Sequence, residues 1–216
     1  LSEYEYQRKG GKIALLLDED DELVYVRHTS GHDDIIIATK KGNATRFDEN
    51  DARPMGRGAR GVRGIRLEEG DYVTGAVLVE DDKTLMTITE NGFGKRSAFD
   101  EFACHNRGGK GVCCHNITEK TGLLASIASV SETDDIMLMT SEGTMIRMSA
   151  DEIPVYRRSA GGVIVMRTAD EAKVASFTVI ANENIEIDES EVAATEVSEK
   201  TEVATEAVET AAGEGE

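Results

Sequence analysis

The stretch TENGFGKRSAF, residues 89–99, decides the fold because it recurs twice more along the chain. The related stretches are ATKKGNATRF (38–47) and TSEGTMIRMS (140–149). Their turn glycines are 50 and 51 residues apart: Gly42, Gly92 and Gly143. Four residues after each glycine stands an arginine: Arg46, Arg96 and Arg147. So many matching positions at one period indicate a tandem repeat.

Further residue positions recur with the same period of about 50 residues. Fifteen residues after each turn glycine stands another arginine: Arg57, Arg107 and Arg158. Gly-Val pairs recur at 61–62, 111–112 and 162–163, and paired aspartates at 33–34, 81–82 and 134–135. Each unit reads as four short strands, which in the second unit are 62–67, 72–79, 84–89 and 93–99. Apolar runs such as 34–39 predict strands covered on both faces. Stacked four-stranded units predict an all-β, propeller-like array.

Charge divides the chain into two parts. The whole chain has a net charge of −18, and residues 181–216 contribute twelve acids and one lysine to it. Such a segment buries too little apolar surface to offset its ordering entropy, so we expect residues 1–180 to fold and residues 181–216 to form a disordered acidic tail. A helix is the alternative for the tail. We also expect the chain to be a fragment, because both ends of the repeat array cut through a unit.

Several features predict a cytoplasmic protein. No apolar run is long enough to span a membrane, and no basic-then-apolar leader opens the chain. The three cysteines include an adjacent pair, Cys113 and Cys114, which cannot join without strain. We therefore expect free thiols, as in a reducing cytosol.

Basic residues are segregated at one position of every unit, between the fourth strand and the following Gly-Val pair. The stretch PMGRGARGVRGIRL (54–67) carries four arginines and no acid. The candidate DNA-binding residues are Arg8, Lys9, Lys12, Arg57, Arg60, Arg63, Arg66, Arg107, Lys110, Arg157 and Arg158. Units arranged around an axis would join these positions into one positive band, which favours contact with a polyanion. Glycines allow close backbone approach, and no aromatic platform for stacked bases is interleaved, so double-stranded DNA held by its backbone is the expected ligand. The alternative is a set of solvated cations paired with the neighbouring acidic turns.

Four stretches carry a resemblance to a known family. MGRGARGVRGIRL, ENGFGKRSAFDEF, NRGGKGV and AGGVIVMRT resemble the C-terminal domain of bacterial DNA gyrase A, over residues 1 to about 180. The resemblance implies a β-pinwheel of four-stranded blades with one strand exchanged between neighbours. It also implies that the domain wraps duplex DNA and so supports ATP-dependent negative supercoiling by the whole enzyme. QRKGGK (7–12) and NRGGKG (106–111) resemble the family's signature box, Gln-Arg-Arg-Gly-Gly-Lys-Gly, and we interpret both as degenerate repeats of it, with the first blades missing.

The resemblance also implies partners and cofactors. The partners are gyrase B and a second copy of gyrase A, and ATP and Mg²⁺ serve the rest of the enzyme, with no catalytic residue and no cofactor in this chain. The equivalent domain of topoisomerase IV is a second hypothesis, and a propeller that docks proteins is a third.

Other chemistry-bearing clusters are weaker. Residues 104–115 hold three cysteines and two histidines, but the paired spacing of zinc ligands is absent, so we predict no metal site. The stretch GFGKRS (92–97) lacks the glycine spacing of a phosphate-binding loop, so we expect a hairpin.

Overall fold

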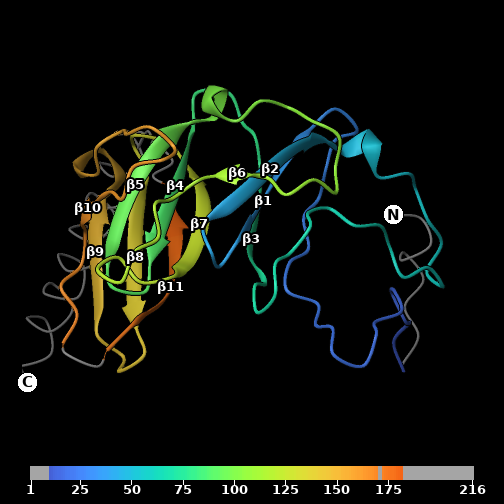
Figure 1. The fold of residues 1–216 in the computed structure, drawn as a ribbon, viewed down its shortest axis with the longest axis horizontal. Helices are drawn as coiled ribbons and strands as arrows, with labels where there is room; N and C mark the ends of the chain where they lie inside the picture. The colour runs from blue at the N-terminus through green and yellow to red at the C-terminus, as the bar shows by residue number, and fades with distance from the viewer. Residues whose placement is uncertain (1–9, 170–171, 182–216) are drawn as a thin grey trace, which may run out of the picture. The chain divides into compact units, whose positions relative to one another are not determined.

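The computed structural model describes residues 10–169 and 172–181, which form three small antiparallel sheets (Figure 1). The chain divides into a compact unit, Leu1–Ala181, and a second unit, Asn182–Glu216. The second unit, and with it the predicted disorder of the acidic tail, lies outside the described residues. Within the described ranges, no helix has the length and hydropathy needed to cross a bilayer.

Each sheet is built around one hairpin. The first has the order β3-β1-β2-β6, from β1 (Asp34–Thr39), β2 (Asn43–Asp48), β3 (Val73–Leu78) and β6 (Val112–Cys113). The second has the order β10-β5-β4-β7, from β4 (Thr84–Thr89), β5 (Phe93–Ala98), β7 (Leu124–Val130) and β10 (Val163–Ile164). The third has the order β11-β8-β9, from β8 (Asp135–Thr140), β9 (Met145–Ser149) and β11 (Val174–Ile180).

The repeated glycines end the hairpin turns, as the sequence predicts. Gly42, Gly92 and Gly143 have φ of +78°, +77° and +83°, a backbone region that residues with a Cβ rarely adopt. Each glycine amide donates to the carbonyl of the threonine three residues earlier, at 2.9 to 3.0 Å. Directly after each hairpin comes a short 3₁₀ helix: η2 (Glu49–Asp51), η3 (Phe99–Glu101) and η4 (Ala150–Glu152).

The strands that the sequence groups into one repeat unit, at 62–67, 72–79, 84–89 and 93–99, do not all belong to one sheet. β3 pairs with the earlier strand β1, in a register that places Val77 opposite Ile36, and β6 crosses back to β2 (Figure 1). β10 makes the same return to β5, so a strand is exchanged between neighbouring sheets, as the resemblance implies. The strand predicted at 62–67 is not formed. This segment matches β6 and β10 in the repeat, and no hairpin precedes β1 among the described residues for it to join.

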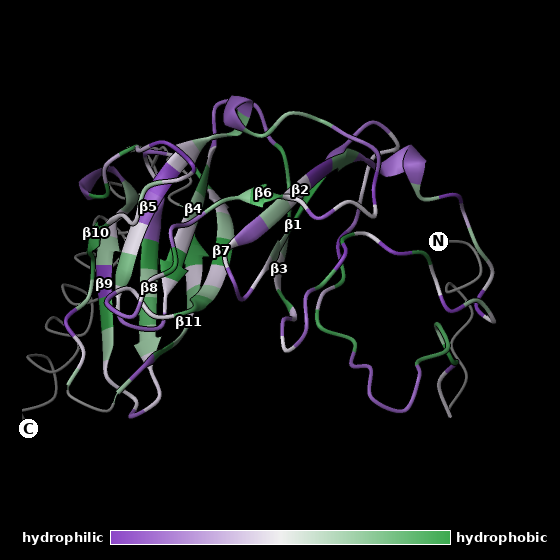
Figure 2. Cartoon of the chain, viewed as in Figure 1, coloured by the Kyte–Doolittle hydropathy of each residue, from purple (hydrophilic) through white to green (hydrophobic). Residues whose placement is uncertain are grey.

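The core lies between successive sheets. One cluster joins Ile36 and Val77 of the first sheet to Leu85 and Leu124 of the second, and Phe102, which follows η3, closes it. A second cluster joins the second sheet to the third in the same way. β4, between the two clusters, is buried at five of its six positions, which confirms the two-sided burial expected of apolar runs. β8 alternates instead, because it packs against another sheet on one side only within the described part of the chain. Figure 2 shows that the strands are largely hydrophobic and that β5 contains a hydrophilic stretch.

Candidate nucleic-acid interface

The predicted basic residues lie in three loops that occupy matching positions. Each loop follows the 3₁₀ helix of one hairpin, and we name them the first (52–67), second (102–111) and third (153–162) basic loops. The second and third loops lead into β6 and β10. Each of these strands pairs with the hairpin one repeat earlier than the hairpin that its loop follows, close to the turn of that earlier hairpin. The amide of Cys114 donates to the carbonyl of Gly42, and that of Val165 to Gly92, both at 2.8 Å.

One hydrogen bond recurs in every loop, made by the bracing arginines, Arg57, Arg107 and Arg158. The Arg107 guanidinium donates to the main-chain carbonyl of Arg63 at 3.0 Å. Arg158 donates to the carbonyl of Cys113 at 3.0 Å, and Arg57 to that of Ile13 at 3.3 Å. Each acceptor lies 44 or 45 residues before its donor, so the bond repeats with the fold. The three half-buried side chains therefore hold each loop to a segment that lies 44 or 45 residues earlier in the chain.

Main-chain bonds join the loops to one another. The amide of Gly108 donates to the carbonyl of Gly64 at 2.5 Å, and the amide of Arg66 donates to Gly109 at 2.7 Å. The segment that directly follows the second loop and β6 bonds to the third loop, since the amide of Asn116 donates to the carbonyl of Ala160 at 3.2 Å. These contacts place the three basic loops side by side, as the repeat predicts.

The other candidate cations of these loops are exposed to solvent. We call them the exposed cations: Arg60, Arg63, Arg66, Lys110 and Arg157. Arg60 makes an ion pair with Asp18 at 2.6 Å, which is the acidic-turn pairing of the alternative interpretation. Because both side chains are more than half exposed, the pair contributes about 0–1 kcal/mol. A phosphate can therefore displace it.

Three candidate cations precede the first basic loop, and one aromatic side chain is exposed in the loops. Lys12 is half-buried, and Arg8 and Lys9 lie outside the described residues. One aromatic side chain, Tyr156, is 42 % exposed in the third basic loop, beside Arg157. A single ring does not make the series of platforms on which consecutive bases stack.

The arginines four residues after the turn glycines serve the fold. The Arg96 side chain is 4 % exposed, and its Nε donates to the carbonyl of Ile153 at 2.7 Å. Arg46 bonds to Asp34 at 2.7 Å and to the carbonyl of Phe99 at 3.1 Å. Both therefore clamp a hairpin to the segment that follows the next one. Arg147 repeats the carboxylate bond of Arg46, with Asp135 at 2.7 Å.

A buried polar cluster behind the third basic loop is not evident from the sequence. Lys95, in β5, is fully buried, and its Nζ donates to the carbonyls of Arg157 at 2.7 Å and Arg158 at 2.5 Å. His115 is 1 % exposed and lies between Thr87 Oγ1, at 2.9 Å from Nδ1, and the Gly161 carbonyl, at 3.1 Å from Nε2. Burial lowers the pKa of Lys95 to about 8. Burial, with the nearby Lys95 charge, lowers the pKa of His115 to about 4, so the imidazole is neutral at pH 7.

The clusters that the sequence discounts take other roles. GFGKRS forms part of the β4–β5 hairpin, as expected. The three cysteines are free thiols, and burial raises the pKa of Cys114 to about 12. Among residues 10–169 and 172–181, no three His, Cys, Asp or Glu side chains come together as a metal site.

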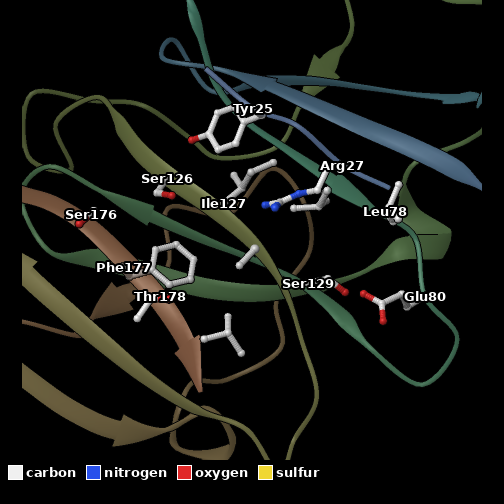
Figure 3. A pocket seen from close by; sticks show the side chains of 13 residues that line it. Tyr25, Arg27, Leu78, Glu80, Ser126, Ile127, Ser129, Ser176, Phe177 and Thr178 are labelled. Carbon is white, nitrogen blue, oxygen red and sulfur yellow. The ribbon is translucent and has the colours of Figure 1, made fainter. Parts of the chain in front are cut away.

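A cavity of about 520 Å³ opens beside β3, β7 and β11 (Figure 3). Its lining is mainly apolar side chains and hydroxyls, with Arg27 and Glu80 as its charged residues. Balanced charge of this kind does not attract a polyanion, so the basic loops are the stronger candidate for the interface.

Comparison with known proteins agrees with this architecture. The family model described as DNA gyrase C-terminal domain, beta-propeller, matches residues 1–30, 33–80, 83–131 and 134–181. The last three segments begin at or beside the paired aspartates, and the segment 33–80 holds a hairpin together with the β3 strand that pairs with it.

Curated relatives include the DNA gyrase A protein of Aminobacterium colombiense, 45 % identical over 87 % of this chain and 23 % of that protein. The DNA gyrase A protein of Escherichia coli is 39 % identical over 84 % of this chain and 21 % of that protein. The chain thus spans about a fifth to a quarter of the length of these relatives.

Two solved structures resemble the fold closely. The C-terminal domain of a DNA topoisomerase IV has a TM-score of 0.76 at 26 % identity, over 82 % of this chain and 55 % of that one. A DNA gyrase A C-terminal domain has a TM-score of 0.71 at 27 % identity, over 80 % of this chain and 59 % of that one. The exchanged strands, the 50-residue period and the matched segments show that the chain belongs to the DNA gyrase C-terminal domain family.

Proposed function

We propose that the three basic loops bind duplex DNA without reading its sequence and bend it along their shared surface. The contiguity of the loops carries this proposal, since main-chain bonds join the first loop to the second, and join the third loop to the segment that directly follows the second. Each loop also exposes cations. Guanidinium and ammonium groups on a surface of one sign bind phosphates and release counterions, whatever the bases. Five exposed cations on linked loops supply such a surface.

The first basic loop has the spacing to follow a DNA strand. Arg60, Arg63 and Arg66 stand three residues apart in a segment that forms no helix. Even a fully extended backbone advances at most roughly 3.3 Å per residue, so the Cα atoms of consecutive arginines lie no more than about 10 Å apart, within the rise of three base pairs. Because the loops belong to successive sheets, a duplex that contacts all three must follow their curvature. Bending a short duplex costs about 1–6 kcal/mol, which the added phosphate contacts offset.

In this proposal the chain serves as the DNA-wrapping part of DNA gyrase A, working with gyrase B and a second copy of gyrase A in negative supercoiling. The curated relatives are gyrase A proteins, which favours gyrase over the equivalent domain of topoisomerase IV. ATP and Mg²⁺ act elsewhere in the enzyme, and we assign no residue of this chain to them. A protein-docking propeller is the remaining alternative.

The test measures the affinity of the chain for two unrelated duplexes of equal length, about four helical turns each, across a series of salt concentrations. We expect equal affinities for both sequences, falling steeply with salt. The variant R60A/R63A/R66A should reduce the slope of log K against log salt by up to about 2.7, since each phosphate contact contributes about 0.9.

The matched control is K41A/K120A/K173A, which removes three exposed lysines outside the basic loops, at or against the hairpin turns. It changes the net charge by the same amount and should leave most of the slope intact. Equal losses in both variants would mean that net charge alone governs affinity. If the chain bound neither duplex, the result would contradict the DNA-binding proposal and favour the protein-docking alternative.

A further inference from the structure

The third basic loop is held from inside by an ammonium group. Lys95 stands three residues after Gly92 in β5 and is fully buried. Its Nζ reaches the carbonyls of Arg157 and Arg158, 62 and 63 residues further along the chain. Buried lysines without a carboxylate partner are uncommon, because removing the charge from water is unfavourable. The two carbonyls are the partners that make this burial tolerable.

Several neighbours reinforce this attachment. The His115 imidazole bonds to the Gly161 carbonyl, and the Ser97 hydroxyl donates to the Tyr156 carbonyl at 2.8 Å. The charged and titratable groups that act on Lys95 come from three segments: Glu101 of η3, Cys113 and Cys114 after the second loop, and Arg158 of the third. Glu101 itself accepts from the Arg158 amide at 2.7 Å.

The second basic loop lacks this attachment. The residue three after Gly42 is Thr45, so the first sheet has a short hydroxyl where the second has the lysine. A cavity of about 330 Å³ lies at this position, lined by Thr45, Phe102, Asn106, Gly109 and Val112 among others. Asn106 and Arg107 match Arg157 and Arg158 in the repeat. The space that Lys95 fills behind the third loop is therefore open behind the second.

We propose that Lys95 is a positioning residue, which fixes the backbone of the third basic loop so that the Arg157 side chain is presented to phosphate. The proposal rests on the function argued above. Lys95 does not contact DNA itself, because its Nζ is enclosed by protein carbonyls. The second basic loop, without such a lysine, is held less firmly.

Two reciprocal variants test this difference by amide hydrogen exchange, which requires no DNA. In K95T, which copies the residue of the first sheet, exchange at the Ala160 amide should rise by at least roughly tenfold, as expected for the loss of two charge-assisted bonds. In T45K, a lysine fills the cavity, and exchange in residues 107–111 should slow. Unchanged exchange in both variants would overturn the proposal, and T45K provides the test if K95T does not fold.

DNA affinity separates positioning from contact. K95T should weaken duplex binding by roughly fivefold, because a smaller fraction of molecules has the loop in its binding shape. Its salt slope should match that of the unaltered chain, whereas R157A should reduce the slope by about 0.9 without changing loop exchange. A reduced slope in K95T would mean that Lys95 contacts phosphate, contrary to the proposal. If the unaltered chain bound no DNA, the proposed function would fail while the exchange result still stood.

Discussion

Two kinds of cation stand three residues apart in the second basic loop. Arg107 is half-buried and donates to the carbonyls of Asp51 and Arg63, at 2.9 and 3.0 Å. Lys110 is exposed to solvent. The same division recurs in the third loop, where Arg158 bonds to the Cys113 carbonyl and Arg157 is exposed. The cation at the strictly periodic position braces the fold, and its less regular neighbour is available to phosphate.

The comparison shows what a periodic arginine means in a repeat protein. A position repeats strictly when the same structural bond is needed in every unit. A phosphate contact needs only positive charge near the right place, so its residue type and spacing vary among the units. Periodicity therefore identifies the basic loops, while exposure separates the cations that we propose to bind phosphate from those that brace the fold.

The largest expected effect concerns the arginines that stand four residues after the turn glycines. R96A should lower the free energy of unfolding by about 4 kcal/mol, because it removes a buried guanidinium and leaves the Ile153 carbonyl without its partner. R147A should cost about 0–1 kcal/mol, because this arginine is 56 % exposed. Urea denaturation of both variants measures the difference. Equal losses would show that burial does not separate the two positions.

A smaller effect concerns the attachment of the third basic loop through His115. The unfolded imidazole has a pKa of about 6.5, whereas the folded one stays neutral until about pH 4. The unfolded chain thus binds the proton first, and the free energy of unfolding falls as pH drops through this window. Between pH 6.5 and 5 we expect a loss of about 2 kcal/mol.

The matched variant for this measurement is H115Q, which keeps a polar side chain without the titration. Its free energy of unfolding should change far less over the same pH range. Parallel curves for the two proteins would show that His115 is not responsible for the loss.

The sequence predicted what local chemistry determines. The turn glycines, the hairpins, the period and the position of the basic loops follow from residues whose backbone or charge requirement is visible in place. Pairing between distant segments was not predictable, because a two-residue strand such as β6 has no pattern that names β2 as its partner. The prediction of a strand at 62–67 is wrong for this reason, because the apolar residues of that segment do not show whether a partner strand is present.

The roles of single cations were only partly predictable. Lys95 follows Gly94 in a hairpin strand, where a lysine usually faces solvent, and its burial depends on carbonyls more than 60 residues away. Arg107 and Lys110 are equivalent in charge, so the sequence assigned both to the same band. The positions of the Asp51 and Arg63 carbonyls, to which Arg107 donates, separate the two.

The most direct test compares two double variants that remove equal charge from the same two loops. In K110A/R157A, the slope of log K against log salt for a duplex should fall by about 1.8, and the free energy of unfolding should change by less than about 0.5 kcal/mol. In R107A/R158A, the slope should stay the same, while the free energy of unfolding should fall by about 2 kcal/mol as the bonds to main-chain carbonyls are lost. The reverse pattern, in which R107A/R158A alone reduces the salt slope, would contradict the assignment of bracing and binding roles.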